Sequence, residues 1–390
     1  MPSNETMLLT DALIGKLKAS DDLRYHLTWT YGMYIQEIPK RIGTNEALDT
    51  AVAALVSAHS NLGSHPSWVT PPEQLSKYLH ALKTFRMSLD DPTKARSAEM
   101  LCAINVLFIC QSFLGRGEAR SLARTGHGER AAQILKTRGY YDSQDDFECQ
   151  IIFSMRGAVL VEALCNPRIC FTPDEWRRLV ENKFDGITSE GVIVRSLAKV
   201  PDIILRGRSA LKEQVGLELL VAEVSHQYVI LKEMLSELHD LLRSVQALAA
   251  TANSPSTLPF PTSSSQSAIS LMKAHAYHQR VYGLSLAFCM VFNCILKALD
   301  PNNTDLDIHS MSFCKEVLEL AEQAAVYRPL GASYVTLCLI AAYCCSREEK
   351  ATQAVIERVL VDYAMDLPVD LGTLKSDLEL ISRRLSLLEP

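Results

Sequence analysis

The sequence predicts an all-α protein in which stacked antiparallel helical hairpins form one large helical domain. Apolar residues recur every three to four positions along almost the whole chain, which is the spacing of one face of a helix. No run of β-branched residues alternates with polar ones as a half-buried strand would. With 48% apolar and 22% charged residues, the 390-residue chain can bury a large core.

The first half of the chain contains eight segments with helical spacing. Ala98–Leu114 is apolar on nearly every face, as a fully buried helix must be, so we expect it near the centre of the array, where we also expect Asp145–Leu164. Thr172, Pro173 and Glu175 form a capping-box pattern, which predicts a helix start at Pro173. The predicted helices are Met7–Ala19, Leu23–Gln36, Glu46–Asn61, Pro72–Ser88, Ala98–Leu114, Thr125–Thr137, Asp145–Leu164 and Pro173–Glu181.

The second half continues the same pattern with two longer helices. Residues 249–267 are rich in Ser, Thr and Pro, which predicts a flexible linker between two long antiparallel helices. We expect an N-terminal helical segment over residues 1–45 and one helical domain over residues 46–390 that contains this linker. The predicted helices are Gly191–Lys199, Pro201–Arg208, Lys212–Leu248, Ala268–Leu299, Met311–Val326, Ser333–Cys345, Lys350–Ala364 and Leu371–Leu388.

The charge balance argues against direct binding to nucleic acid. The chain carries 39 basic and 45 acidic residues, a net charge of -6, and its longest basic runs are pairs such as Arg177-Arg178. A protein that binds DNA by itself usually presents a basic face, because neutralising phosphates releases counterions. We therefore expect protein partners and no direct nucleic-acid partner.

We expect neither a metal site, a cofactor nor a membrane partner. Most of the eleven cysteines lie in apolar helical runs, and no Cys-x-x-Cys pair occurs, whereas structural zinc sites use closely spaced ligand pairs. Phosphate-binding and dinucleotide-binding glycine motifs are also missing from the sequence. The uninterrupted apolar runs are shorter than the roughly 20 residues that cross a bilayer, and no secretory signal is visible at the N-terminus.

Two blocks of the sequence resemble a known family. The first runs from Thr84 to Val180 and contains an Ala-Arg-Ser helix start, the helix HGERAAQILKTRG from His127, and the pattern Phe171-x-x-x-x-Trp176. The second is FCKEVLELAEQAAVYRPLGASYVTLCLIAAY, from Phe313 to Tyr343. Together they resemble the regulatory domain of fungal-specific transcription factors, the helical part that normally follows a six-cysteine zinc cluster. The resemblance spans residues 48–366.

The resemblance implies a regulator of transcription without its own DNA-binding zinc cluster. Such a chain would act in the nucleus, or alternatively in the cytoplasm, and control a secondary-metabolite gene cluster. Its expected partners are a zinc-cluster transcription factor and a small-molecule effector, with a homodimer left open. The alternative is an enzyme on the same scaffold, namely an isomerase, cyclase or dehydratase of secondary metabolism.

Histidines are the candidates for acid–base chemistry if the chain is an enzyme. His275 and His278 share one helix face, and His226 lies on the preceding long helix, so a bundle cavity could bring the three together. His127 opens a helix and could stay neutral as a base, although packing at the helix start is the favoured interpretation. No nucleophile motif accompanies these residues, which favours the regulator.

Overall fold

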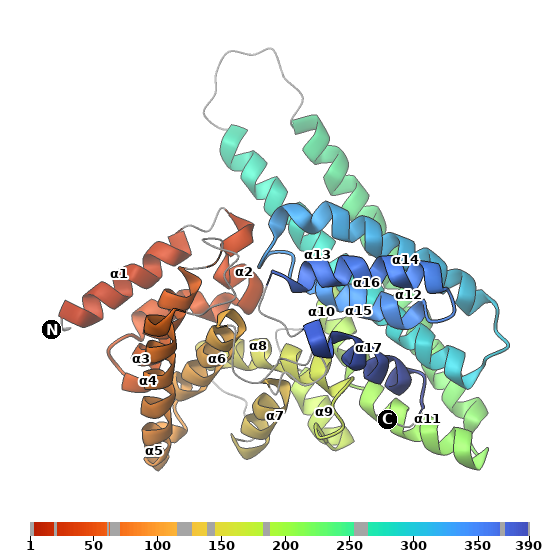
Figure 1. The fold of residues 1–390 in the computed structure, drawn as a ribbon, viewed down its shortest axis with the longest axis horizontal. Helices are drawn as coiled ribbons and strands as arrows, with labels where there is room; N and C mark the ends of the chain where they lie inside the picture. The colour runs from red at the N-terminus through yellow and green to blue at the C-terminus, as the bar shows by residue number, and fades with distance from the viewer. Residues whose placement is uncertain are drawn as a thin grey trace. The chain divides into compact units, whose positions relative to one another are not determined.

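The computed structural model describes residues 4–18, 22–60, 62, 71–114, 127–138, 145–181, 188–252, 264–366 and 371–388. All regular secondary structure in these ranges is helical, as predicted (Figure 1). The chain divides into two compact units. Unit 1 comprises Met1–Cys170, Pro329–Gly331 and Ala364–Lys375, and unit 2 comprises Phe171–Arg328, Ala332–Tyr363 and Ser376–Pro390. Residues 1–45 are part of unit 1, so the boundary expected near residue 45 does not coincide with this division.

Unit 1 is organised around α6, a helix with apolar residues on every side. Ten of its side chains are buried, among them Leu101, Val106 and Leu107, and α6 contacts α3, α4 and α8. The elements of unit 1 are α1 (Asn4–Lys18), η1 (Leu23–Tyr25), α2 (Leu27–Tyr31), η2 (Met33–Lys40), α3 (Glu46–His59), α4 (Pro72–Leu89), α5 (Pro92–Ala95), α6 (Ala98–Phe113), α7 (His127–Arg138) and α8 (Asp146–Ala163).

Unit 2 is organised around α13. Leu286, Met290 and Phe292 on this helix are fully buried, and α13 contacts α12, α14 and α15. The elements of unit 2 are α9 (Pro173–Val180), α10 (Ser189–Leu197), α11 (Val200–Glu213), α12 (Leu217–Ala252), α13 (Ser264–Leu299), α14 (Asp305–Ala324), η3 (Ala325–Tyr327), α15 (Tyr334–Cys345) and α16 (Lys350–Ala364), while α17 (Leu371–Leu385) begins in unit 1 and ends in unit 2.

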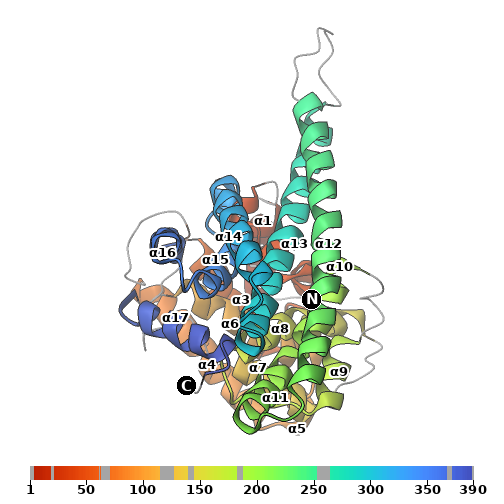
Figure 2. The ribbon, with the colours of Figure 1, turned by 90° about the vertical axis from the view of Figure 1, so that its right-hand side faces the viewer.

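The long helices α12 and α13 form an antiparallel hairpin, as the sequence predicted (Figures 1 and 2). Asn293 donates a hydrogen bond to the Tyr228 hydroxyl oxygen (3.3 Å), and the Tyr282 ring lies 5.8 Å from the His239 ring. These two contacts fix the register of the pair. Residues 253–263, the middle of the predicted linker, lie outside the described residues, while residues 249–252 and 264–267 are helical.

Two predicted helices are interrupted by backbone conformations. The segment predicted as one helix over Leu23–Gln36 forms η1, α2 and part of η2. The extended backbone of His26 separates η1 from α2, and Gly32, with a φ of 114° that no α-helix contains, separates α2 from η2. The helix predicted over Lys212–Leu248 is broken between α11 and α12, where Gln214 (φ 55°) and Gly216 (φ 72°) are left-handed. By contrast, the predicted capping box at Thr172 is confirmed, with both reciprocal hydrogen bonds present.

The expectation that no segment could cross a bilayer considered only uninterrupted apolar runs, and helix α13 is longer than the apolar run within it. The expectation is therefore corrected. Ile269–Leu299 is long and apolar enough to do so by length and composition. Most of this segment is buried against other helices of unit 2, however, and the core helix of a water-soluble protein passes the same test. The helix is therefore weak evidence for a membrane.

Candidate functional site

An apolar cavity of about 650 Å³ lies within unit 1, between α4, α5, α6, α7 and α8. Leu89 and Pro92 lie at its exposed side, while Met100 and Leu101 on α6 are buried. The lining residues are Phe85, Leu89, Pro92, Ala95, Arg96, Met100, Leu101, Ile104, Gln133, Ile134, Thr137 and Glu148.

Four polar side chains interrupt the apolar lining. The Thr137 hydroxyl donates to the backbone carbonyl of Gln133 (2.9 Å), so it is already used within α7. Arg96, at the end of α5, and the Gln133 amide are exposed. Glu148 in the first turn of α8 is half-buried and has interactions of its own within the protein. A mostly apolar cavity with a few polar groups is the usual composition of a small-molecule site.

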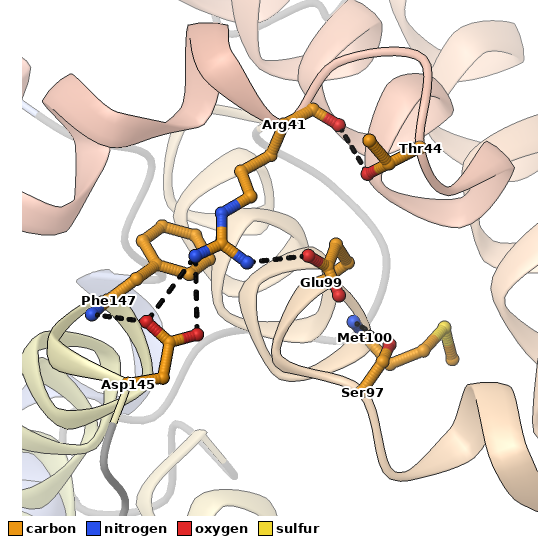
Figure 3. A network of polar contacts seen from close by, with 7 residues as sticks. All are labelled: Arg41, Thr44, Ser97, Glu99, Met100, Asp145 and Phe147. Carbon is orange, nitrogen blue, oxygen red and sulfur yellow. Dashed lines mark hydrogen bonds and ion pairs between the residues drawn. The ribbon is translucent and has the colours of Figure 1, made fainter.

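One arginine ties together the N-termini of the two helices beside the cavity. Arg41 donates to Glu99 in the first turn of α6 (2.8 Å) and to Asp145, the N-cap of α8 (3.2 Å), as Figure 3 shows. Its guanidinium also lies over the Phe147 ring, 4.5 Å from the centroid. The hydrogen bond that Arg41 donates to the Glu99 carboxylate is the main reason that the pKa of Arg41 is raised. Because Glu99 precedes the lining residue Met100, this network sets where α6 meets the cavity.

A buried glutamate of α8 holds the N-terminus of α7 against α8. The Gly128 backbone N–H donates to the Glu162 carboxylate (2.9 Å), and the Asn166 amide donates to both Glu162 and Glu129 (3.0 Å each). A carboxylate at a helix N-terminus is stabilised by the unpaired N–H groups there. The close approach of α8 also explains why residue 128 is a glycine: an added Cβ would lie 2.6 Å from the Ala158 carbonyl oxygen.

We predict that Arg41→Met lowers the free energy of unfolding by about 1–2 kcal/mol, because two partly buried carboxylates lose their shared cation. Chemical denaturation of the purified protein measures this change. The control is Arg24→Met, which removes an exposed arginine that pairs with its close neighbour Asp22 and lies over the adjacent Tyr25 ring, and which should leave stability unchanged. Equal effects of the two substitutions would contradict the structural role of the Arg41 network.

The predicted grouping of His226 with His275 and His278 is not formed. His226 is exposed, and on the register of α12 and α13 the residue opposite His278 is Arg243. His226 and Arg243 are roughly 17 residues apart on α12, which corresponds to about 25 Å of helix. His275 and His278 are close to each other, and the pKa of His275 is lowered by burial and then by His278. The His127 backbone begins α7, but its side chain lies outside the described residues.

The structure instead places a different histidine in a polar cluster of unit 2. His309 on α14 lies 3.1 Å from the Tyr228 hydroxyl through Nδ1 and 2.9 Å from Lys232 Nζ through Nε2. An ammonium group only donates, so Nε2 accepts and the neutral ring carries its proton on Nδ1. Burial, followed by the charge of Lys232, lowers the pKa of His309, which agrees with a neutral ring. Sequence reasoning missed His309 because its partners Tyr228 and Lys232 lie on α12, far from α14 in the sequence.

No three metal-ligating side chains come together among the residues that the structure describes. No family model, curated protein or solved structure matches the chain. The family resemblance noted in the sequence therefore remains an expectation, and the cavity in unit 1 is the feature on which a function can be argued.

Proposed function

We propose that this chain is the regulatory part of a transcription-factor-like protein, which binds a small apolar effector in the unit 1 cavity. The cavity carries this proposal. Its volume of about 650 Å³ lies in the range of 300–1,000 Å³ typical of small-molecule sites. Its walls come from five helices, so an occupant would stabilise their mutual packing and favour one arrangement of unit 1 over others.

Within this proposal the chain acts in the nucleus through a protein partner, such as a zinc-cluster transcription factor, and controls a secondary-metabolite gene cluster. The sequence resemblance supports the class of regulator. The net charge of -6 supports a protein partner over DNA, because DNA binding by the chain alone would call for a basic face.

A second candidate function is catalysis at His275 and His278. The lowered pKa of His275 favours a neutral imidazole, which can accept a proton at neutral pH. Next to His278, the Tyr277 hydroxyl donates to the Glu190 carboxylate, and the Tyr277 and His278 rings pack edge to face. An isomerase or dehydratase acting on a secondary metabolite would use such a base.

Deletion of the gene, followed by complementation, tests the two functions against each other. We expect deletion to change the transcripts of several neighbouring genes together. The wild-type gene and His275→Ala/His278→Ala should restore them, whereas Ile104→Trp/Ile134→Trp, which fills the cavity, should not. Purified variants must first be shown to unfold at temperatures close to wild type. Unchanged transcripts, with one intermediate accumulating and only the histidine variant failing to restore the product, would favour the enzyme.

A further inference from the structure

We infer that the unit 1 cavity takes an elongated apolar molecule with a carboxylate at one end, and that Arg96 binds this carboxylate. The inference rests on the proposed effector function of the cavity and adds the chemical class of the effector.

The charged side chains of the lining point to an anion. Among the described residues that line the cavity, Arg96 and Glu148 carry opposite charges. Glu148 already has interactions within the protein, whereas the Arg96 guanidinium makes no hydrogen bond or ion pair with any residue that the structure describes. A guanidinium has a planar fork of N–H donors that matches a carboxylate, and charge-assisted pairs of this kind are among the stronger hydrogen bonds. The available charge in the lining is therefore positive.

The remainder of the cavity suits an extended hydrocarbon. Met100 and Ile104 lie one turn apart on α6, and Ile134 on α7 lines the same cavity. Arg96 precedes the first turn of α6, so the charge lies toward the N-terminal end of this apolar strip. The exposed guanidinium can keep its charge hydrated while it pairs with the ligand, and the buried α6 side chains contact the chain of the ligand. A molecule with one acidic end and an apolar body can pair with Arg96 and contact the apolar strip at the same time.

Three twelve-carbon probes with different head groups test the inference. Dodecanoic acid, dodecanol and dodecylamine are compared, at concentrations at which each is dissolved as single molecules, for displacement of a neutral fluorescent probe from the purified protein. We expect the acid to bind more tightly than the alcohol by roughly three- to tenfold, the range for a charged pair at a partly exposed site. Arg96→Gln should reduce the affinity for the acid to that for the alcohol and leave the alcohol unaffected.

Arg86→Gln is the matched control, since it removes the same charge from an exposed position on α4 that does not line the cavity. Arg96→Lys should retain part of the preference for the acid. Equal affinities of the acid and alcohol for the wild type would overturn the inference, as would equal losses in Arg86→Gln and Arg96→Gln. Preference for the amine would overturn it in favour of Glu148 as the anchor.

The inference and the proposed function fail in different ways. If all three probes bind without preference for the acid, the inferred pairing of a carboxylate with Arg96 is wrong, but an apolar effector site is still supported. If binding is selective for the acid but transcripts are unchanged in the deletion strain, the inference is supported and the proposed regulatory function is contradicted. Absence of binding by any probe contradicts both.

Discussion

Replacing Gly128 by alanine is expected to lower the free energy of unfolding by about 2–4 kcal/mol. Two effects contribute: the added methyl group overpacks the contact between α7 and α8, and the hydrogen bond from the residue 128 N–H to the charged Glu162 carboxylate is weakened. The new methyl group would lie 2.6 Å from the Ala158 carbonyl oxygen and 2.7 Å from Glu162 Cβ. The first of these atoms belongs to the backbone of α8 and cannot turn away as a flexible side chain can. Helices α7 and α8 must therefore separate, which weakens the bond from the Gly128 N–H to Glu162.

Gly157→Ala is the control for this prediction. Gly157 lies on the exposed side of α8, and an added Cβ would meet nothing within 4 Å. Alanine is favoured over glycine within a helix, so this variant should be more stable than wild type by about 0.5–1 kcal/mol. Urea denaturation monitored by circular dichroism measures both values. A neutral effect of Gly128→Ala would mean that α7 does not pack on α8 as closely as described.

The second large effect is expected from Asn293→Asp, with a loss of about 3–5 kcal/mol near pH 7, the cost of an uncompensated buried charge. Asn293 is fully buried on α13. Its amide donates to the Leu306 carbonyl oxygen (3.0 Å) and to the Tyr228 hydroxyl, while its own oxygen accepts from Ser310 (2.9 Å). A carboxylate of the same shape loses both donors and brings an oxygen against the Leu306 carbonyl.

The loss should depend on pH with a defined sign. Burial raises the pKa of the new carboxyl group in the folded state above about 3.9, its value in the unfolded chain. Below that pH the group is neutral in both states and the loss is smallest; as the pH rises toward the folded-state pKa, the unfolded state binds fewer protons and stability falls. Asn302→Asp, at an exposed position, should show no such dependence. Parallel denaturation curves at several pH values decide between these outcomes.

Local patterns in the sequence were enough to predict most helices. The apolar run of α6 and the capping box at Thr172 are each contained within a few neighbouring residues, and both are confirmed. The break at Gln214 could not be predicted in the same way, because glutamine rarely adopts a left-handed conformation and gives no local signal for one. Glycine is the residue expected at such positions, and Gly32 and Gly216 were detectable in principle.

The candidate sites depended on information that is not local. Whether His226 meets His275 depends on the register of two long helices, and contacts such as Tyr228 with Asn293 fix that register. The helical spacing places His275 and His278 on one face but says nothing about what lies opposite them. The cavity of unit 1 was missed for a related reason, because its walls come from five helices and no single one carries a motif.

The distribution of cysteines gives the protein a single convenient position for chemical labelling. Nine of the eleven thiols are buried, Cys165 is half-buried, and Cys170 is exposed. Burial raises the pKa of thiols such as Cys102 and Cys338, which keeps them protonated and unreactive toward alkylating reagents. A maleimide added at one equivalent should therefore mark Cys170 without any cysteine having to be removed. Unfolding exposes the remaining thiols, so unfolded molecules gain more mass from excess iodoacetamide than folded ones. The mass spectrum of a mixture therefore gives the fraction of molecules that are unfolded.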